Sequence, residues 1–294
     1  MGDAPSARAP WVSATVGDAP SPHERRLVVC HIVFDQLPAL TVVLLCLVAL
    51  VAGWIDAIVG GGGVIQLPAM LIAVPAQTPI ATISGTNKLS SVVGTAMASA
   101  TYLSKVRIHW PTTLIAVAFA YGGSTVGAHL IQFVPRDAFV PIMVVVVAVV
   151  GIYTWRRPQL GQSARTTAFG LRRAAIAAAV GLVCGLWDGV IGPGTGVFLV
   201  IAFVALLGYE FLEATTMAKV VNLATNIAAL VVLGTSGHII WMLGACMAAC
   251  NMAGAAVGSR MAIKHGNEFI RTIFLVAVVI VEIRLIYETV RLLW

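Results

Sequence analysis

The feature that most constrains this chain is a long apolar run that ends abruptly in four consecutive glycines. The run covers residues 40–59, which is long enough to cross a bilayer, and it carries one carboxylate, Asp56, a turn before the glycines of residues 60–63. A break in a membrane helix leaves amide and carbonyl groups that need protein or water partners, and a carboxylate beside it is costly and usually functional. The stretch therefore predicts a broken membrane helix that carries a functional site.

The same construction returns in the second half of the chain. Asp188 follows Asp56 by 132 positions, and Gly192 follows Gly60 by the same interval. Further along, the interval becomes 131, and it aligns a lysine, a tryptophan and a glycine of the two halves: Lys88 with Lys219, Trp110 with Trp241, and Gly127 with Gly258. The chain is therefore predicted to be a tandem duplication of one membrane unit.

Composition places the chain among membrane proteins. Hydrophobic residues make up 59% and charged residues 10% of the sequence, against roughly 25% charged residues in soluble domains. The net charge of +6 comes mainly from arginine and lysine in short loops, so it indicates membrane topology rather than nucleic-acid binding. The five cysteines form no CxxC pair, and neither a metal nor a cofactor is expected.

The predicted fold is an all-α polytopic membrane protein built from two repeats. Residues 1–37 are expected to be a disordered tail with a short lead-in. A basic cytoplasmic linker at 156–173 separates membrane repeats at 38–155 and 174–294. Each repeat contains five apolar segments, which lie at 39–59, 64–76, 83–103, 112–133 and 139–155 in the first and at 174–191, 197–207, 214–233, 242–262 and 269–287 in the second.

The placement of basic residues predicts that the two repeats have inverted topology. In the first repeat the loop with Lys105 and Arg107 is expected on the same side as the basic linker. In the second repeat the equivalent loop, residues 234–240, has no lysine or arginine, and the basic residues move to the next loop, with Arg260, Lys264 and Arg271. Inversion requires an odd number of crossings per repeat. Five full spans satisfy this requirement, and so do three spans with the broken pair as a re-entrant hairpin.

Inverted repeats with helices broken at matching positions are typical of secondary transporters that bind substrate near the middle of the membrane. Half-helices that begin at the glycines would point their N-terminal N–H groups into the breaks, where they favour anions. One lysine from each repeat is expected to approach the same central cavity. The predicted substrate site contains glycines of both breaks, lysines, amides and one hydroxyl: Gly60, Gly61, Gly62, Gly63, Asn87, Lys88, Gly192, Gly194, Thr195, Gly196, Lys219, Asn222 and Asn226.

Each of these groups also has a purely structural interpretation. Asp56 and Asp188 either cap the N–H groups of a facing half-helix or act in proton coupling or gating, and the two roles are compatible. The alternative for the glycines is a tight helix crossing that needs small residues. The alternative for the lysines is an ammonium group that extends to the membrane surface. The recurrence of both lysines in register favours a site.

The chain resembles the TauE/SafE sulfite exporter family, also called the four-toluene-sulfonate uptake permease family. The resemblance rests on GWIDAIVGGGGVIQLPA, SGTNKL, GLWDGVIGPGTG and AKVVNLATN, and it covers residues 38–290. Within the family the chain is most similar to the uncharacterised YfcA-like inner-membrane branch. The resemblance implies a bacterial inner-membrane carrier for sulfite, an organosulfonate or a related anion. Pro193 and Thr195 depart from a fully glycine-rich second motif.

Residues and resemblance together predict a multi-pass secondary transporter of the bacterial inner membrane for a small sulfur-containing anion, and not an enzyme. Its expected partners are the anionic substrate and the lipid bilayer, without nucleic acid, and a homo-oligomer is left open. Two alternatives are an anion channel and an intramembrane lipid-phosphate hydrolase. A hydrolase needs clustered glutamates or a serine and histidine pair near a basic group, whereas each break offers a single aspartate.

Overall fold

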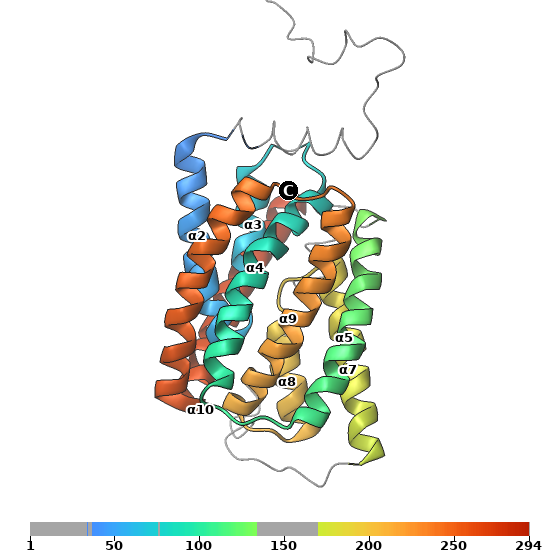
Figure 1. Ribbon diagram of the computed structural model, residues 1–294. Helices are drawn as coiled ribbons and strands as arrows, with labels where there is room; N and C mark the ends of the chain where they lie inside the picture. Colours follow the sequence, from blue (N-terminus) through green and yellow to red (C-terminus); the bar gives the residue numbers. More distant parts are fainter. Residues whose placement is uncertain (1–33, 35–36, 76, 134–169, 294) are drawn as a thin grey trace, which may run out of the picture.

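The computed structural model describes residue 34 and residues 37–75, 77–133 and 170–293, and the structural statements below concern these residues. They form eight α-helices and one 3-10 helix (Figure 1). The helices are α2 (Ala39–Val59), α3 (Gly63–Ala73), α4 (Ile80–Leu103), α5 (Trp110–Leu130), η1 (Ile131–Phe133), α7 (Leu171–Val190), α8 (Thr195–Leu207), α9 (Phe211–Thr235) and α10 (Trp241–Leu293). In the described ranges five helices are long and apolar enough to cross a membrane: α2, α5, α7, α9 and the Trp241–Gly266 part of α10.

The all-α membrane fold predicted from the sequence is confirmed, and most predicted segments end within a few residues of a helix end. The element α10 contains two of the predicted segments, and a kink at Gly266, which has the non-helical angles φ 72° and ψ −159°, separates them. The predicted segment at 139–155 and nearly all of the predicted tail and linker lie outside the described residues. The division of the chain into two repeats and a linker stays a prediction.

Both predicted breaks interrupt the helices where the sequence places them. Helix α2 ends at Val59 because Gly60 adopts the left-handed conformation, with φ 90°. Helix α3 then runs for 11 residues, or about 16 Å, which is about half of a 30 Å hydrocarbon core. In Figure 1, α2 and α4 both begin at the upper end of the bundle. The chain therefore enters the bundle through α2 and returns to the same end through α3. This arrangement favours the re-entrant hairpin over two full spans.

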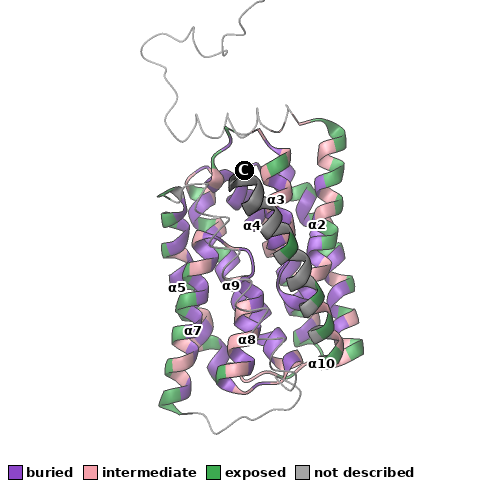
Figure 2. Ribbon diagram, turned by 180° about the vertical axis from the view of Figure 1, so that it is seen from behind, coloured by how far each residue is buried: buried purple, intermediate pink, exposed green. Residues whose placement is uncertain are grey.

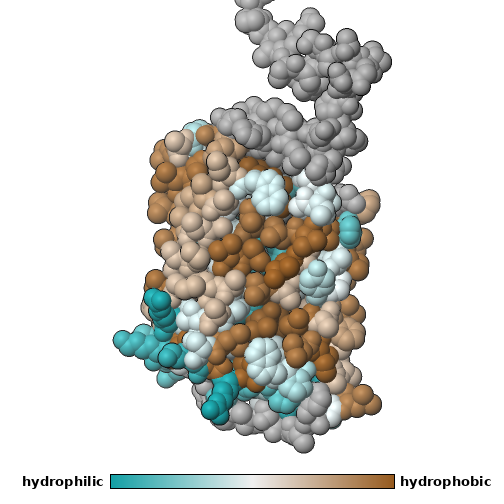
Figure 3. Space-filling model, in the orientation of Figure 1, coloured by the Kyte–Doolittle hydropathy of each residue, from teal (hydrophilic) through white to brown (hydrophobic). Residues whose placement is uncertain are grey.

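Helices that the predicted alignment of the two halves makes equivalent run in opposite directions. In Figure 1, α2 and α4 run downward from the upper end, whereas α7 and α9 run upward from the lower end. Likewise α5 runs upward, and the first part of α10 runs downward to the bend at Gly266. The turn between α4 and α5, the start of α7 and the bend at Gly266 therefore share the lower end. Figure 3 shows strongly hydrophilic residues gathered at that end, below a mainly hydrophobic face.

Close glycine contacts join helices of different halves. Helix α2 packs against α10: a Cβ built on Gly53 would lie 2.2 Å from the carbonyl oxygen of Asn251. Helix α7 packs against α5 in the same way, because a Cβ on Gly185 would lie 2.2 Å from the carbonyl oxygen of Ala120. Small residues let membrane helices approach to this distance. Each close pair thus combines one helix from each half of the chain.

The bundle exposes apolar side chains on its outer surface and buries polar side chains among an otherwise apolar core. Apolar side chains such as Leu40 and Val183 are exposed on the outside, which suits contact with lipid. Inside, α4 and α9 bury lysine, asparagine, serine and threonine side chains. Figure 2 shows the exposed residues along the outward faces of the helices and the buried ones toward the centre. The polar side chains of α4 and α9 therefore collect where the helices meet, away from the outer surface.

Candidate functional site

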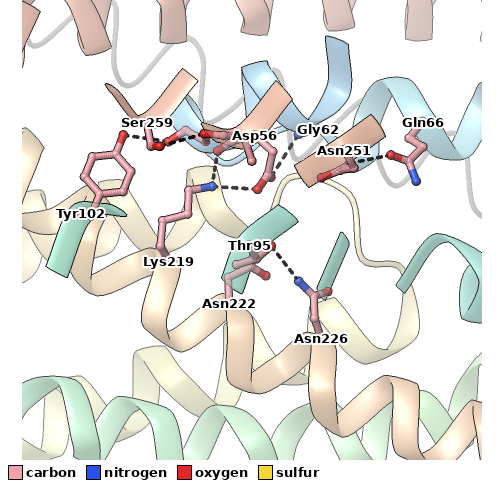
Figure 4. A network of polar contacts seen from close by, with 12 residues as sticks. Asp56, Gly62, Gln66, Thr95, Tyr102, Lys219, Asn222, Asn226, Asn251 and Ser259 are labelled. Atoms are coloured by element: carbon pink, nitrogen blue, oxygen red, sulfur yellow. Dashed lines mark hydrogen bonds and ion pairs between the residues drawn. The ribbon is translucent and has the colours of Figure 1, made fainter. Parts of the chain in front are cut away.

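The first break brings together an aspartate, a lysine and the start of a half-helix. Asp56 lies in the last turn of α2, and its Oδ2 is 2.9 Å from the Nζ of Lys219, which comes from α9. The same ammonium group also donates to the backbone carbonyl of Asp56, which faces the break. On its other side, the Asp56 Oδ1 accepts a hydrogen bond from the N–H of Gly62, at the start of α3, over 3.3 Å (Figure 4).

The second break contains the equivalent ion pair, formed by the other aspartate and the other lysine. Asp188 lies near the end of α7, and its Oδ2 is 2.6 Å from the Nζ of Lys88 on α4. Lys88 also donates to the Oδ1 of Asn226 over 3.1 Å, and Asn226 donates to the hydroxyl of Thr95 over 3.4 Å. Both charged side chains are almost fully buried, at 3% exposure for Lys88 and 2% for Asp188.

The two ion pairs are reciprocal. The lysine of the first half pairs with the aspartate of the second half, and the lysine of the second half pairs with the aspartate of the first half. The alignment of the halves identified all four residues, but it gave no reason to pair them across the halves. Inside a protein an opposite charge at this distance stabilises both ions, whereas either ion alone is very costly.

The glycine breaks lie directly against each other. A Cβ built on Gly60 would lie 2.6 Å from the backbone of Gly196, so no side chain fits at Gly60. Gly63 approaches Pro193 in the same region, with its Cβ position 3.5 Å from the proline Cα. The sequence led us to expect a cavity between the breaks. At Gly60 and Gly196 the backbones touch, so no cavity separates these two residues.

The remaining predicted site residues have different surroundings. The Thr195 hydroxyl donates to the carbonyl of Gly192 over 2.7 Å and supports the turn before α8. The Asn222 side chain accepts from the hydroxyl of Thr225 on its own helix, over 3.3 Å. The buried Oδ1 of Asn87 finds no hydrogen-bond partner among the described residues. Contact of any of these residues with a substrate stays a prediction.

The first break contains two groups that attract negative charge, and Asp56 binds both of them. The N-terminal N–H groups of a half-helix and a lysine ammonium group are the groups that attract an anion. Both are used here by one carboxylate, because Asp56 accepts from Gly62 and pairs with Lys219. The site therefore already holds an anion, supplied by the protein itself. In the described part of the chain, no group of three or more His, Cys, Asp or Glu residues is placed to hold a metal ion.

Sequence reasoning missed two buried amides beside the first break. Gln66 of α3 and Asn251 of α10 join through a hydrogen bond of 3.0 Å from the Asn251 Nδ2 to the Gln66 Oε1 (Figure 4). Tyr102 was also missed, and its hydroxyl donates to the carbonyl of Ala57 over 2.8 Å. A single polar residue within an apolar run is the signal that would have identified both amides.

Comparisons with known proteins agree on one family. The family described as sulfite exporter TauE/SafE matches residues 45–285. "Probable membrane transporter protein YfcA" of Escherichia coli strain K12 is 33% identical over 243 residues, which cover 82% of this chain and 88% of the relative. "Probable membrane transporter protein ORF9" of Sinorhizobium sp is 34% identical over 244 residues, which cover 82% and 90%. A "Probable membrane transporter protein" of Haemophilus influenzae is 32% identical over 254 residues, covering 85% and 95%. No solved structure matches the chain significantly.

Proposed function

The chain belongs to the sulfite exporter TauE/SafE family, and from this we propose that it is a secondary carrier of a small anion in the bacterial inner membrane. It is a multi-pass membrane transporter and not an enzyme, so the lipid-phosphate hydrolase alternative is removed. The family description favours sulfite, an organosulfonate or a related sulfur-containing anion as substrate. The substrate class remains part of the proposal.

The observation that carries the proposal is the pair of reciprocal ion pairs at two helix breaks. Each break combines a half-helix, an aspartate and a lysine, and each lysine reaches the break from the other half of the chain. In secondary transporters, broken helices at matching positions hold the substrate and the coupling ion between two repeats. Two matched sites joined across the halves support binding at the centre of this protein.

The proposed mechanism is a competition between substrate and carboxylate. The anion takes the place of Asp56 beside Lys219 and the start of α3, or the place of Asp188 beside Lys88. An ion pair is neutral, so an added anion brings one uncompensated negative charge into a medium of low dielectric constant, which is costly. A proton on the displaced aspartate restores neutrality. We therefore propose that Asp56 and Asp188 couple anion movement to protons.

We also propose that the two repeats are inverted, because inverted repeats allow the central site to open to either side of the membrane. Opposite helix directions in Figure 1 and the exchanged close pairs, α2 with α10 and α5 with α7, support this arrangement. We expect residue Gln162 in the cytoplasm and Ser236 outside. A single cysteine at each position, tested with an impermeant thiol reagent on whole cells, checks the assignment. Equal labelling of both positions from outside would contradict it.

Counterflow in proteoliposomes tests the carrier. Vesicles loaded with unlabelled sulfite or an organosulfonate should transiently accumulate the labelled anion from outside, because a carrier exchanges substrates, whereas a channel only lets them equilibrate. Lys219→Met should abolish this accumulation by removing the cation at the first break. Lys105→Met is the matched control, since Lys105 is exposed in the turn between α4 and α5. Equilibration without accumulation would favour the anion channel.

A further inference from the structure

We propose that Gln66, Asn251 and Asn87 form a neutral polar subsite, which binds an uncharged hydrogen-bonding group of the substrate beside its anionic end. The inference rests on the proposed function, because it names a further part of the same substrate site. It identifies the substrate class as a short oxyanion that carries a hydroxyl or amide group at its other end. Gln66 and Asn251 do not belong to the site predicted from the sequence.

The amide of Gln66 is held at one end and unpaired at the other. Its Oε1 accepts from the Nδ2 of Asn251 over 3.0 Å, and the two residues are 1% and 4% exposed. The buried Nε2 of Gln66 has no hydrogen-bond partner among the described residues. A buried donor without a partner is costly, and such a group in a native fold needs an explanation. A substrate acceptor would supply the missing partner.

Two more unpaired polar atoms lie on the face of α4 that meets Asn251. A Cβ on Gly94 would lie 1.8 Å from the Oδ1 of Asn251, so these residues touch. Asn87 and Ser90 lie seven and four positions before Gly94, on the same face of the helix. The Asn87 Oδ1 and the Ser90 Oγ are buried and have no partner among the described residues. The donor of Gln66 thus has unpaired acceptors on the neighbouring helix.

This amide group is one helical turn away from the anion-binding groups of the first break. Gln66 follows Gly62 by four residues on α3, which corresponds to about 5.4 Å along the helix axis. Gly62 in turn contacts the carboxylate of Asp56, which pairs with Lys219 (Figure 4). An oxyanion beside Lys219 with a polar group two carbon atoms away matches this spacing.

The second break keeps the ion pair but has no amide at the positions equivalent to Gln66, Asn87 and Asn251; its own amide, Asn226, is hydrogen-bonded to Lys88 and Thr95. The alignment of the halves places Phe198 at the position of Gln66 and Ala120 at that of Asn251. It places Ala218 at the position of Asn87, and Val221 at that of Ser90. Phe198 instead packs edge-on against Trp187, with the ring centroids 5.6 Å apart. A requirement of the fold would apply to both halves, whereas an unsymmetrical substrate needs its second group bound on one side only.

The chemistry of the subsite selects the class of ligand. Gln66, Asn251, Asn87 and Ser90 carry donors and acceptors but no charge. A hydroxyl or amide group both donates and accepts, so it can accept from the Gln66 Nε2 and donate to an unpaired acceptor on the facing side of α4. A second carboxylate or an ammonium group would be buried without a counter-ion, which these neutral side chains cannot offset. The subsite therefore favours monoanions with a neutral polar end.

The test compares two sulfonates that differ in one hydroxyl group. Purified protein in detergent is titrated with 2-hydroxyethanesulfonate and with ethanesulfonate, and 3-hydroxypropanoate and propanoate repeat the comparison with a carboxylate. The wild type should bind the hydroxylated member of a pair about fivefold more tightly, the typical contribution of one neutral hydrogen bond. Gln66→Met, which keeps the volume and removes the amide, should abolish this ratio. Equal binding within both pairs by the wild type would overturn the subsite.

Three variants separate this inference from the proposed function and from loss of folding. Lys219→Met should weaken both members of a pair alike, since it removes the cation and leaves the amides; no effect there would contradict the anion site and not the subsite. Phe198→Leu, at the equivalent position of the second half, should leave the ratio unchanged. If Gln66→Met does not fold, Asn251→Ala, which removes the anchor of Gln66, should lower the ratio in the same direction. An equal loss for both ligands in a folded Gln66→Met or Asn251→Ala protein would overturn the proposal.

Discussion

The two helix breaks have the same ion pair in different surroundings. At the second break, Asp188 is 2% exposed, and its partner Lys88 also donates a hydrogen bond to Asn226. At the first break, Asp56 is 17% exposed and shares its charge between Lys219 and the N–H of Gly62. The predicted duplication accounts for the shared charges, and the surroundings of the two pairs differ. The second pair is sealed inside the protein, whereas at the first pair the lysine is buried and the aspartate is partly exposed.

The largest expected effect is on stability at the sealed pair. Asp188→Asn leaves the Lys88 ammonium group buried without a counter-charge, which should cost about 3–5 kcal/mol of stability. The double variant Lys88→Met with Asp188→Leu should recover most of this loss, because no unpaired charge remains. Thermal unfolding in detergent measures both. Asp56→Asn should cost clearly less, and an equal loss at both aspartates would show that their difference in exposure has no energetic meaning.

The next effect concerns anion affinity. Lys88→Met keeps the apolar stem of the side chain and removes its charge, so we expect a loss of about 1.5–3 kcal/mol in anion binding, or about tenfold to a hundredfold in affinity. Lys219→Met should have a similar effect if the two breaks bind the substrate in turn. Titration of both variants with sulfite or an organosulfonate decides this. A loss confined to one lysine would assign the substrate to one break and leave the other pair as a structural contact.

A smaller effect is expected from the contact between the breaks. Gly60→Ala places a Cβ 2.6 Å from the backbone of Gly196 and imposes the left-handed conformation on alanine, which costs about 1–2 kcal/mol before any clash. Gly61→Ala is the matched control, because its Cβ would meet only the side chain of Val197, at 3.7 Å. Counterflow and thermal unfolding should both be impaired in the first variant alone. Equal behaviour of the two variants would mean that the breaks separate readily.

The smallest effect is a change in pH dependence. Protonation of Asp56 removes the negative charge that competes with substrate for Lys219, so anion binding by the wild type should strengthen as the pH falls. Asp56→Asn should bind the anion with little dependence on pH, because the competing charge is permanently absent. Titrations at acidic and neutral pH test this, with the exposed Glu268→Gln as control. Wild-type pH dependence in Asp56→Asn would transfer the coupling role to Asp188.

The sequence predicted the helices and the breaks because these depend on local features. Apolar length determines a span, and Gly60 and Gly192 end their helices through positive φ values, which glycine adopts freely. The ion pairs could not be predicted, because hydrophobic periodicity says which residues share a helix face and not which helices meet. Lys88 reaches Asp188, which lies near the end of α7, only after α4 packs beside α9 in three dimensions.

The hydrogen bond between Gln66 and Asn251 could not be predicted from the sequence either. Gln66 is a single polar residue in an apolar segment, and Asn251 lies far away in the sequence, in a helix that otherwise reads as an ordinary span. Their hydrogen bond connects α3 and α10, although the two residues are 185 positions apart along the chain. The features that the two halves share identify the breaks and the charged residues of the ion pairs. The positions where the halves differ, such as Gln66 and Phe198, are the ones from which we infer a subsite for an unsymmetrical ligand.

The exchanged glycine contacts have a consequence for how the protein can be assembled. Gly53, Gly254 and Gly258 hold α2 against α10, while Gly123, Gly127 and Gly185 hold α5 against α7. In each of these two close pairs, one helix comes from the first half of the chain and the other from the second half. We expect two separately encoded fragments, divided between residues 156 and 169, to recover one functional carrier on co-expression, while each fragment alone is degraded. In that case the covalent linker only ensures equal amounts of the two fragments, because the glycine contacts between the helices hold the fragments together.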